Sequence, residues 1–221
     1  MELIDLTIAF IGDSITEGIG ATSKECSFPS VFEKNTDIKK AFNYGLSGTR
    51  IARQKKTFMN YSEWDNDFIS RVDIMDSGAD CIVVCGGIND YMHGDAELGC
   101  LYDSTEYTFY GAMNILINKL KSKFPEKLLI FMTPIHFVEE KSPEYAHINK
   151  GYYFYEYLNA IKEVCAYHSI VLFDLHSEIG IDSKNAHDKE QFYSDNIHLN
   201  DNGYKKIAEK LEDFLKGLNV K

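Results

Sequence analysis

Residues 6–18 read LTIAFIGDSITEG, an apolar run that ends directly in a glycine, an aspartate and a serine. The run is apolar at nearly every position, which is typical of a strand covered on both faces in a parallel sheet. A surface turn needs Gly12 and Asp13, but it has no need of Ser14 at the start of a helix. The stretch therefore predicts a buried strand, and it raises the question of whether Ser14 is a turn residue or a nucleophile.

Four more short runs are rich in β-branched or aromatic residues and are expected to form the other strands. They are KAFNYG (40–45), CIVVCG (81–86), LLIFMT (128–133) and IVLFDL (170–175). Between them, segments 105–122 and 152–167, and the segment that begins at residue 201, carry apolar residues along one helical face. Alternating strands and helices predict right-handed crossovers and a three-layer α/β/α fold. In such a fold the ligand crevice lies beyond the carboxyl ends of the strands.

Length and composition limit the classes of function. A chain of 221 residues without a linker-like stretch predicts a single domain over 1–221. The net charge of −11 disfavours nucleic acids and anionic membrane surfaces, which would repel it. No run reaches the ~18 apolar residues of a membrane helix, so we expect no membrane insertion. Five cysteines without metal-site spacing, and no signal-like opening segment, predict a cytoplasmic protein. We expect a small-molecule substrate as the partner and no cofactor. Assembly into a homo-oligomer stays open as an alternative to a monomer.

Polar or flexible residues follow three of the predicted strands, and an Asp/His pair precedes the last predicted helix. Ser14 follows the first strand, Gly48 lies in GLSGTR after the second, and Asn89 lies in GGIND after the third. Asp195 and His198 lie in DNIHLN, three residues apart. Because the carboxyl ends of parallel strands meet at one edge of a sheet, we expect these residues to lie close together.

These residue types are the ones that acyl transfer requires. Ser14 would attack a carbonyl carbon once a base takes its proton, and His198 is suited to that task at neutral pH. Asp195 lies within reach of the same imidazole and would fix its tautomer. The backbone N–H groups of Ser14 and Gly48, with the side-chain amide of Asn89, would supply an oxyanion hole. The pattern predicts an enzyme with a serine nucleophile.

Taken in order, the motifs resemble the four blocks of the SGNH (GDSL-type) hydrolase family. They are GDSIT (12–16), NYGLSGTR (43–50), GGIND (86–90) and DNIHLN (195–200). Ile15 stands where the family name has Leu, and Leu199 where many members have Pro, but neither departure removes a catalytic atom. The resemblance implies a flavodoxin-like fold with a five-stranded parallel sheet in the order 2-1-3-4-5. It also implies ester hydrolysis through Ser14, His198 and Asp195.

Other histidines compete for the role of the base. They are His136, His176 and His187. We favour His198, because its spacing from Asp195 and its position before the final helix fit a catalytic triad.

A metal site and a phosphate-binding loop are the alternative interpretations of the crevice. The hard-ligand donors there are Asp13, Asn89, Asp195 and His198. Metallophosphoesterases of the GD…GNHD type need more histidines at such loops, so we expect no metal. GDSITEGIG lacks the Gly-Lys-Ser/Thr of a Walker loop, and Glu17 would repel the phosphate of a flavodoxin-like cofactor.

Two tyrosine-rich segments, 91–107 and 136–157, follow strands on the crevice side and are longer than a crossover requires. They make Tyr91 and His136 candidates for the substrate pocket, together with Asp13 beside the nucleophile. The sequence contains no broad apolar lid of the kind found in long-chain lipases. We therefore expect an ester of a short acyl group, such as acetyl, with a carbohydrate or another small alcohol. A lysophospholipase or thioesterase is the alternative enzyme, and a binding protein without turnover is the alternative outside catalysis.

Overall fold

Five parallel strands form one sheet in the order β2-β1-β3-β4-β5. The strands are β1 (Thr7–Gly12), β2 (Lys40–Gly45), β3 (Cys81–Cys85), β4 (Leu128–Met132) and β5 (Val171–Phe173). The computed structural model describes residues 2–57, 62–148 and 151–218. This strand order and the parallel pairing confirm the fold predicted from the sequence.

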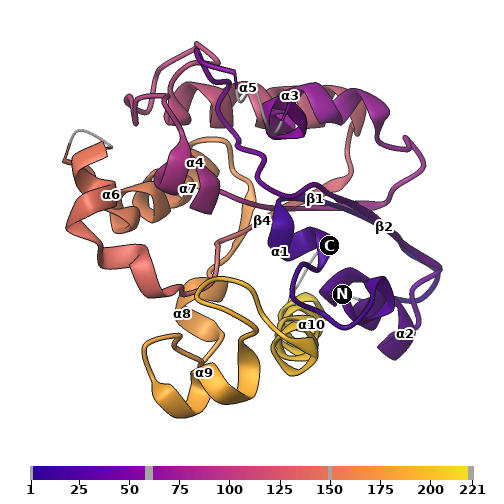
Figure 1. The fold of residues 1–221 in the computed structure, drawn as a ribbon. Coiled ribbons are helices and arrows are strands. Elements are labelled where there is room, and N and C mark those ends of the chain that lie inside the picture. Colours follow the sequence, from indigo (N-terminus) through magenta and orange to yellow (C-terminus); the bar gives the residue numbers. More distant parts are fainter. Residues whose placement is uncertain (1, 58–61, 149–150, 219–221) are drawn as a thin grey trace.

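Helices cover both faces of the sheet (Figure 1). One layer holds α2 (Phe28–Asn35) and α10 (Asp201–Gly217), and the other holds α3 (Phe68–Arg71), α5 (Phe109–Lys123) and α7 (Phe154–Tyr167). The shorter helices are α1 (Ser14–Glu17), α4 (Ile88–His93), α6 (Pro143–Ile148), α8 (Leu175–Glu178) and α9 (Ala186–Phe192). Single 3₁₀ turns are η1 (Lys24–Cys26), η2 (Ser62–Asp65), η3 (Val72–Ile74) and η4 (Val138–Lys141). The result is the expected three-layer α/β/α arrangement.

The burial of the strands follows their position in the sheet. Every residue of β3 is buried, whereas the edge strand β2 is at most partly covered. On the α2 face, the Phe10 ring meets the rings of Phe28 and Phe32 edge-on, with centroids 5.5 and 6.1 Å apart. Central strands covered on both faces need apolar side chains at successive positions, which explains the continuous apolar runs in the sequence.

Several predicted boundaries differ from the observed ones, and two of the differences show a local cause. The helix expected over 105–122 begins at Phe109, since the Thr108 hydroxyl accepts the backbone N–H of Gly111 at 3.3 Å and caps the helix there. The strand expected over 170–175 is shorter, because α8 already begins at Leu175.

The strand register brings the carboxyl ends of β1, β2 and β3 to one level. Gly12 pairs with Gly45 of β2 and with Cys85 of β3. The buried guanidinium of Arg71 ties this edge together, because it donates to the carbonyl oxygens of Gly12 (2.9 Å) and Tyr44 (2.5 Å). The loops that carry Ser14, Gly48 and Asn89 therefore start from a fixed base.

Candidate active site

The structure brings Ser14, His198 and Asp195 together across 184 residues of chain. The Nε2 atom of His198 lies 3.0 Å from the Ser14 hydroxyl oxygen, and Nδ1 lies 2.7 Å from a carboxylate oxygen of Asp195. A carboxylate can only accept, so Nδ1 carries the proton and the lone pair of Nε2 faces Ser14. This tautomer leaves His198 able to accept the serine proton.

The turn that contains Asp195 and His198 is held by its own backbone. One carboxylate oxygen of Asp195 accepts the backbone N–H groups of Ile197 (2.7 Å) and His198 (2.6 Å), while the other oxygen meets the imidazole. The carbonyl of His198 accepts the N–H of Ser194 at 2.9 Å. Three-residue spacing therefore lets one carboxylate hold both the loop and the ring.

Asp195 is the exposed end of this group, with 53% of its side chain accessible against 21% for His198. Its partial burial acts to raise the pKa of Asp195, but the hydrogen bonds from His198 and Ile197 outweigh burial and hold that pKa below its usual value. The carboxylate is therefore charged at neutral pH and can stabilise an imidazolium.

Ser14 is the first residue of α1, so its backbone N–H has no acceptor within the helix. Asp13 caps the helix by accepting the N–H of Ile15 at 3.0 Å. The carboxyl group of Asp13 is buried, and burial raises its pKa to about 6. Asp13 was expected as a pocket residue, but the structure gives it the place of a buried cap behind Ser14. Because α1 has a single turn, the backbone N–H of Ser14 matters more here than the dipole of the helix.

Gly48 lies in a tightly packed loop. Its φ of +73° is in the left-handed region, and a Cβ at this position would lie 2.1 Å from the indole Nε1 of Trp64. Either feature alone would disfavour any other residue. The same loop is tied to α1, because the Glu17 carboxylate accepts the N–H of Ser47 at 2.7 Å. The indole of Trp64 therefore forms a wall directly beside Gly48.

Asn89 is oriented by His93, which lies one turn further along α4. Arg50 can only donate, so its 3.2 Å contact with Nδ1 of His93 makes that nitrogen an acceptor. Nε2 of His93 then carries the proton and donates to Oδ1 of Asn89 at 3.1 Å. The amide nitrogen of Asn89 donates to the carbonyl of Thr49 at 3.0 Å. This chain of contacts fixes which end of the amide is the donor.

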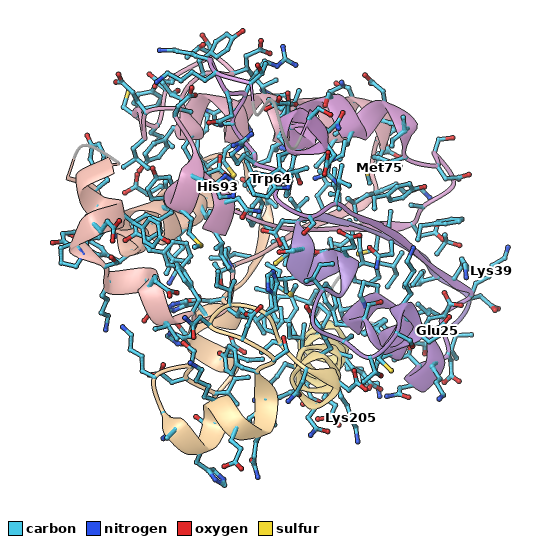
Figure 2. The ribbon with its side chains drawn as sticks, in the orientation of Figure 1. Glu25, Lys39, Trp64, Met75, His93 and Lys205 are labelled. Carbon is cyan, nitrogen blue, oxygen red and sulfur yellow. The ribbon has the colours of Figure 1, made fainter. Side chains whose placement is uncertain are left out.

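Burial, followed by the nearby charge of Arg50, lowers the pKa of His93 to about 4, so the ring is neutral near pH 7. The ring also stacks on Trp64, with centroids 4.8 Å apart. Figure 2 labels the two residues next to each other. The sequence analysis did not include His93 or Trp64 among the site residues. The signal for His93 was its spacing of four residues from Asn89, because residues four apart on a helix lie on the same face. Trp64 carried only the signal of being the single tryptophan of the chain.

Asp90, the last residue of GGIND, holds the loop that follows Gly48. Its two carboxylate oxygens accept the backbone N–H groups of Ile51 and Ala52, each at 2.9 Å. Burial raises the pKa of Asp90 to about 6 in spite of these bonds. The motif therefore supplies an amide for the site and a carboxylate for the neighbouring loop.

Tyr91 does not line a substrate pocket. Its side chain is fully buried among aromatic rings, and its hydroxyl donates to the carbonyl of Ser142 at 3.2 Å. The rings around it belong to Phe137, Tyr145, Phe154 and Tyr157. The expectation was wrong because helix α4 turns this tyrosine toward α6 and α7. The longer of the two tyrosine-rich segments also crosses residues 149–150, which lie outside the described residues.

His136 contacts Glu140 and His176, and no triad residue is among its hydrogen-bond partners in the described chain. Its Nδ1 lies 3.0 Å from a carboxylate oxygen of Glu140, and Nε2 of His176 lies 3.2 Å from the same oxygen. Burial acts to raise the pKa of Glu140, but the two imidazoles outweigh burial and bring that pKa well below its usual value. His136 and His176, both competitors for the base, thus belong to a separate group.

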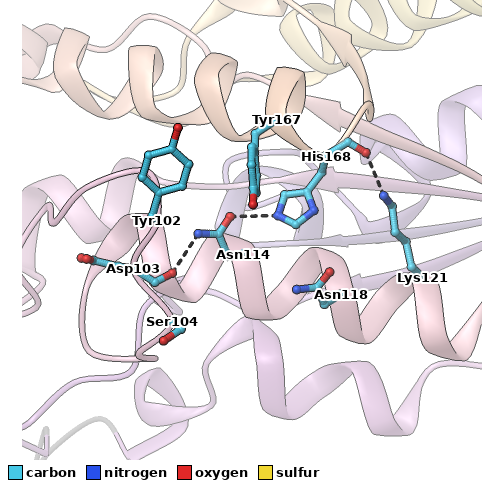
Figure 3. Close-up of a pocket in the computed structure, with 8 residues that line it drawn as sticks. All are labelled: Tyr102, Asp103, Ser104, Asn114, Asn118, Lys121, Tyr167 and His168. Carbon is cyan, nitrogen blue, oxygen red and sulfur yellow. Dashed lines mark hydrogen bonds between the residues drawn. The ribbon is translucent and has the colours of Figure 1, made fainter.

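A polar cavity of about 550 Å³ lies beside α5 and the end of α7 (Figure 3). Asn114 crosses it: its side-chain oxygen accepts from Nε2 of His168 at 2.8 Å, and its amide nitrogen donates to the carbonyl of Asp103 at 2.9 Å. None of the predicted site residues lines this cavity.

No helix in the described part of the chain combines the length and the apolar character needed to cross a membrane.

Residues 10–206 match the GDSL-like Lipase/Acylhydrolase family. Among curated protein sequences, none matches the chain.

Solved structures resemble this one over nearly the whole chain. A protein from Lactobacillus plantarum is 26% identical with a TM-score of 0.82, covering 99% of this chain and 100% of that one. A lipase/acylhydrolase from Enterococcus faecalis is 18% identical with a TM-score of 0.63, covering 96% of each chain. A carbohydrate acetylesterase family member from Sinorhizobium meliloti is 19% identical with a TM-score of 0.62, covering 96% of this chain and 97% of that one. The last two likenesses show the fold alone. The family match over residues 10–206 identifies the chain: it belongs to the GDSL-like lipase/acylhydrolase family of ester-hydrolysing enzymes.

Proposed function

We propose that the chain is a serine esterase that uses Ser14, His198 and Asp195 as a catalytic triad. The observation that carries the proposal is the position of the His198 ring, with one nitrogen 2.7 Å from Asp195 and the other 3.0 Å from the Ser14 hydroxyl. A serine hydroxyl is a weak nucleophile until a base within hydrogen-bond distance takes its proton. His198 is placed to do so.

In the acylation step, the Ser14 oxygen attacks the ester carbonyl while Nε2 of His198 takes the hydroxyl proton. Asp195 stabilises the resulting imidazolium through the proton on Nδ1. The imidazolium then returns a proton to the leaving alcohol, and an acyl-serine remains. In the second half, Nε2 takes a proton from the water that attacks the acyl group, and the imidazolium then returns that proton to the Ser14 oxygen as the carboxylic acid leaves.

The negative oxygen of each tetrahedral intermediate needs donors that are already in place. The proposed donors are the backbone N–H groups of Ser14 and Gly48 and the second amide N–H of Asn89. The fixed orientation of the Asn89 amide supports the third donor. His93 donates to the amide oxygen, and one amide N–H donates to the carbonyl of Thr49.

We propose a short acyl group, such as acetyl, on a carbohydrate or another small alcohol. The indole of Trp64 fills the space beside Gly48, which leaves little room for a long acyl chain near the oxyanion donors. The half-exposed carboxylate of Asp195 indicates a site that opens to solvent on the side of the histidine. A polar leaving alcohol is suited to an open, solvated exit.

The test compares the hydrolysis of p-nitrophenyl acetate by wild type, Ser14→Ala and Ser122→Ala. We expect Ser14→Ala to lower kcat/KM by about 10⁴-fold or more, because the triad acts as a unit. Ser122 lies on the exposed side of α5 and is the matched control, with an expected rate equal to wild type.

Equal release of p-nitrophenol by wild type and Ser14→Ala would refute the nucleophile and favour a binding protein without turnover. A series of p-nitrophenyl esters with acyl chains from acetyl to decanoyl then tests the substrate. A maximum in kcat/KM at long chains would contradict the short-acyl proposal and favour a lysophospholipase-like or thioesterase-like activity.

A further inference from the structure

A second group of chemically active side chains lies outside the triad. His136 and Glu140 lie four residues apart after β4, Glu140 within η4, and His176 lies in α8, so two segments of the chain contribute. One ligand atom from each residue lies within 4.8 Å of the other two. Glu140 is only 6% exposed, whereas both imidazoles keep part of their surface open. The group is therefore shielded but accessible from solvent.

The donor set and its spacing suit a zinc ion. Two imidazoles and a carboxylate are common zinc ligands, with bonds of about 2.0–2.2 Å. In a tetrahedral site such bonds separate neighbouring ligand atoms by roughly 3.3 Å. The observed separations from the Glu140 oxygen are 3.0 Å to His136 and 3.2 Å to His176. The two ring centroids are 3.7 Å apart, so the rings must spread somewhat around a metal.

The charges around Glu140 leave one side of the carboxylate for a cation. Oε2 faces both imidazoles, while Oε1 faces the ammonium group of Lys184 at 3.8 Å. The lysine is partly exposed and lies on the opposite oxygen, so it balances part of the charge without occupying the position between the rings. The two imidazoles already hydrogen-bond to this oxygen, and a cation bound between the rings would replace those contacts as the partner of the buried carboxylate.

We propose that His136, Glu140 and His176 bind one Zn²⁺ ion, with water as the fourth ligand. Imidazole nitrogens favour zinc over the harder magnesium and calcium ions, which prefer oxygen ligands. The proposed site differs from the donors Asp13, Asn89, Asp195 and His198, where the sequence indicated no metal.

The site is joined to the loop that carries the triad. The hydroxyl of Tyr193 donates to the carbonyl of His136 at 3.1 Å, and the backbone N–H of Val138 donates to the carbonyl of Asn196 at 3.0 Å. A bound ion fixes residues 136–140 and, through these two bonds, the turn around Asp195. The expected role of the metal is to stabilise this turn, while the ester chemistry stays with Ser14.

The experiment treats the full chain with EDTA, removes the chelator and titrates it with CoCl₂ and, separately, with ZnCl₂. We expect one equivalent of Co²⁺ to bind with the visible d–d absorption of a tetrahedral site, and Zn²⁺ to displace it. Zn²⁺ should raise the Tm because it binds the folded state. MgCl₂ should do neither.

Three variants assign the binding to these residues. His176→Ala and Glu140→Gln should each weaken Co²⁺ binding by more than the ~10- to 100-fold that loss of an outer-shell partner costs. His187→Ala removes an exposed histidine of α9 and should bind like wild type. Hydrolysis of p-nitrophenyl acetate and circular dichroism report whether each variant is folded.

Two results would overturn the proposal. The first is the absence of tetrahedral Co²⁺ absorption in wild type, and the second is equal Co²⁺ affinity in wild type and a folded His176→Ala protein. If Glu140→Gln does not fold, His176→Ala decides alone. Neither result bears on the triad, which is tested independently by Ser14→Ala.

Discussion

Two regions of the molecule join an imidazole to a carboxylate, and they differ in burial and in number of partners. Asp195 holds one imidazole at 2.7 Å and has 53% of its side chain exposed. Glu140 is 6% exposed and meets two imidazoles through a single oxygen, at 3.0 and 3.2 Å. Both groups come from the same side of the fold and are linked through Tyr193 and Val138.

The two groups differ in the partners of their imidazole rings. The free side of the His198 ring meets a hydroxyl at 3.0 Å, which gives the pair a proton to move. In the other group both rings face the same carboxylate oxygen, and this is the arrangement for which we propose a metal ion. Residue types alone therefore do not distinguish a base from a ligand, whereas the partner of each ring nitrogen does.

The largest expected effect comes from removing the imidazole of the first group. His198→Ala should lower kcat/KM for p-nitrophenyl acetate by about 10⁴-fold or more, because the serine loses its base. His187→Ala is the matched control, since it removes an exposed histidine that also lies next to an aspartate, and should keep the wild-type rate. A His198→Ala enzyme within tenfold of wild type would show that another group takes the proton.

A third carboxylate, Asp13, separates the effect of burial from the effect of an imidazole partner. Both carboxyl groups are buried, Asp13 more completely, but burial raises the pKa of Asp13 to about 6, whereas the two histidines bring that of Glu140 down. A carboxyl whose pKa is higher in the folded state binds its proton more tightly there. Its contribution to stability is thus greatest below the unfolded pKa of 3.8 and is lost as the pH rises toward 6.

Asp13→Asn removes this titration and keeps an oxygen that accepts the N–H of Ile15. The unfolding free energy of the variant relative to wild type should therefore rise between pH 4 and pH 7, by on the order of 3 kcal/mol at most. Urea unfolding at several pH values measures it. A difference that stays constant or falls with pH would mean that the folded protein does not raise the pKa of Asp13.

The sequence predicted the parts of the fold and site that depend on local patterns and on sheet topology. Continuous apolar runs identify strands buried on both faces, and the carboxyl-edge rule brings the loops of Ser14, Gly48 and Asn89 to one place. The spacing of Asp195 and His198 is local, because one carboxylate can hold both the turn and the ring.

The contacts that the sequence did not predict depend on side chains that meet over long distances. Trp64 reaches Gly48 from η2, and Glu140 and His176 meet across 36 residues. No periodicity encodes such pairs. Tyr91 failed as a pocket residue because a tyrosine after a strand can turn to solvent or into the core, and only the packing of α6 and α7 decides which.

The smallest expected effect concerns a histidine whose ring nitrogens face Arg50 and Asn89. His93→Ala frees the Asn89 amide to rotate, so the proposed oxyanion donor is less well placed. We expect kcat to fall by about tenfold with little change in KM, less than the ~100-fold or more that follows loss of a donor itself. His93→Gln supplies another N–H and should recover part of the loss.

The His93→Ala effect should be the same from pH 5 to pH 8, because burial and Arg50 hold the pKa of His93 at about 4 and the ring is neutral over that range. A double-mutant cycle with Asn89→Ala separates positioning from general destabilisation. If His93 acts only through the amide, adding His93→Ala to Asn89→Ala changes kcat no further. A full tenfold loss in the Asn89→Ala background would show instead that His93 supports the site by another route, through Trp64 or Arg50, which it also contacts.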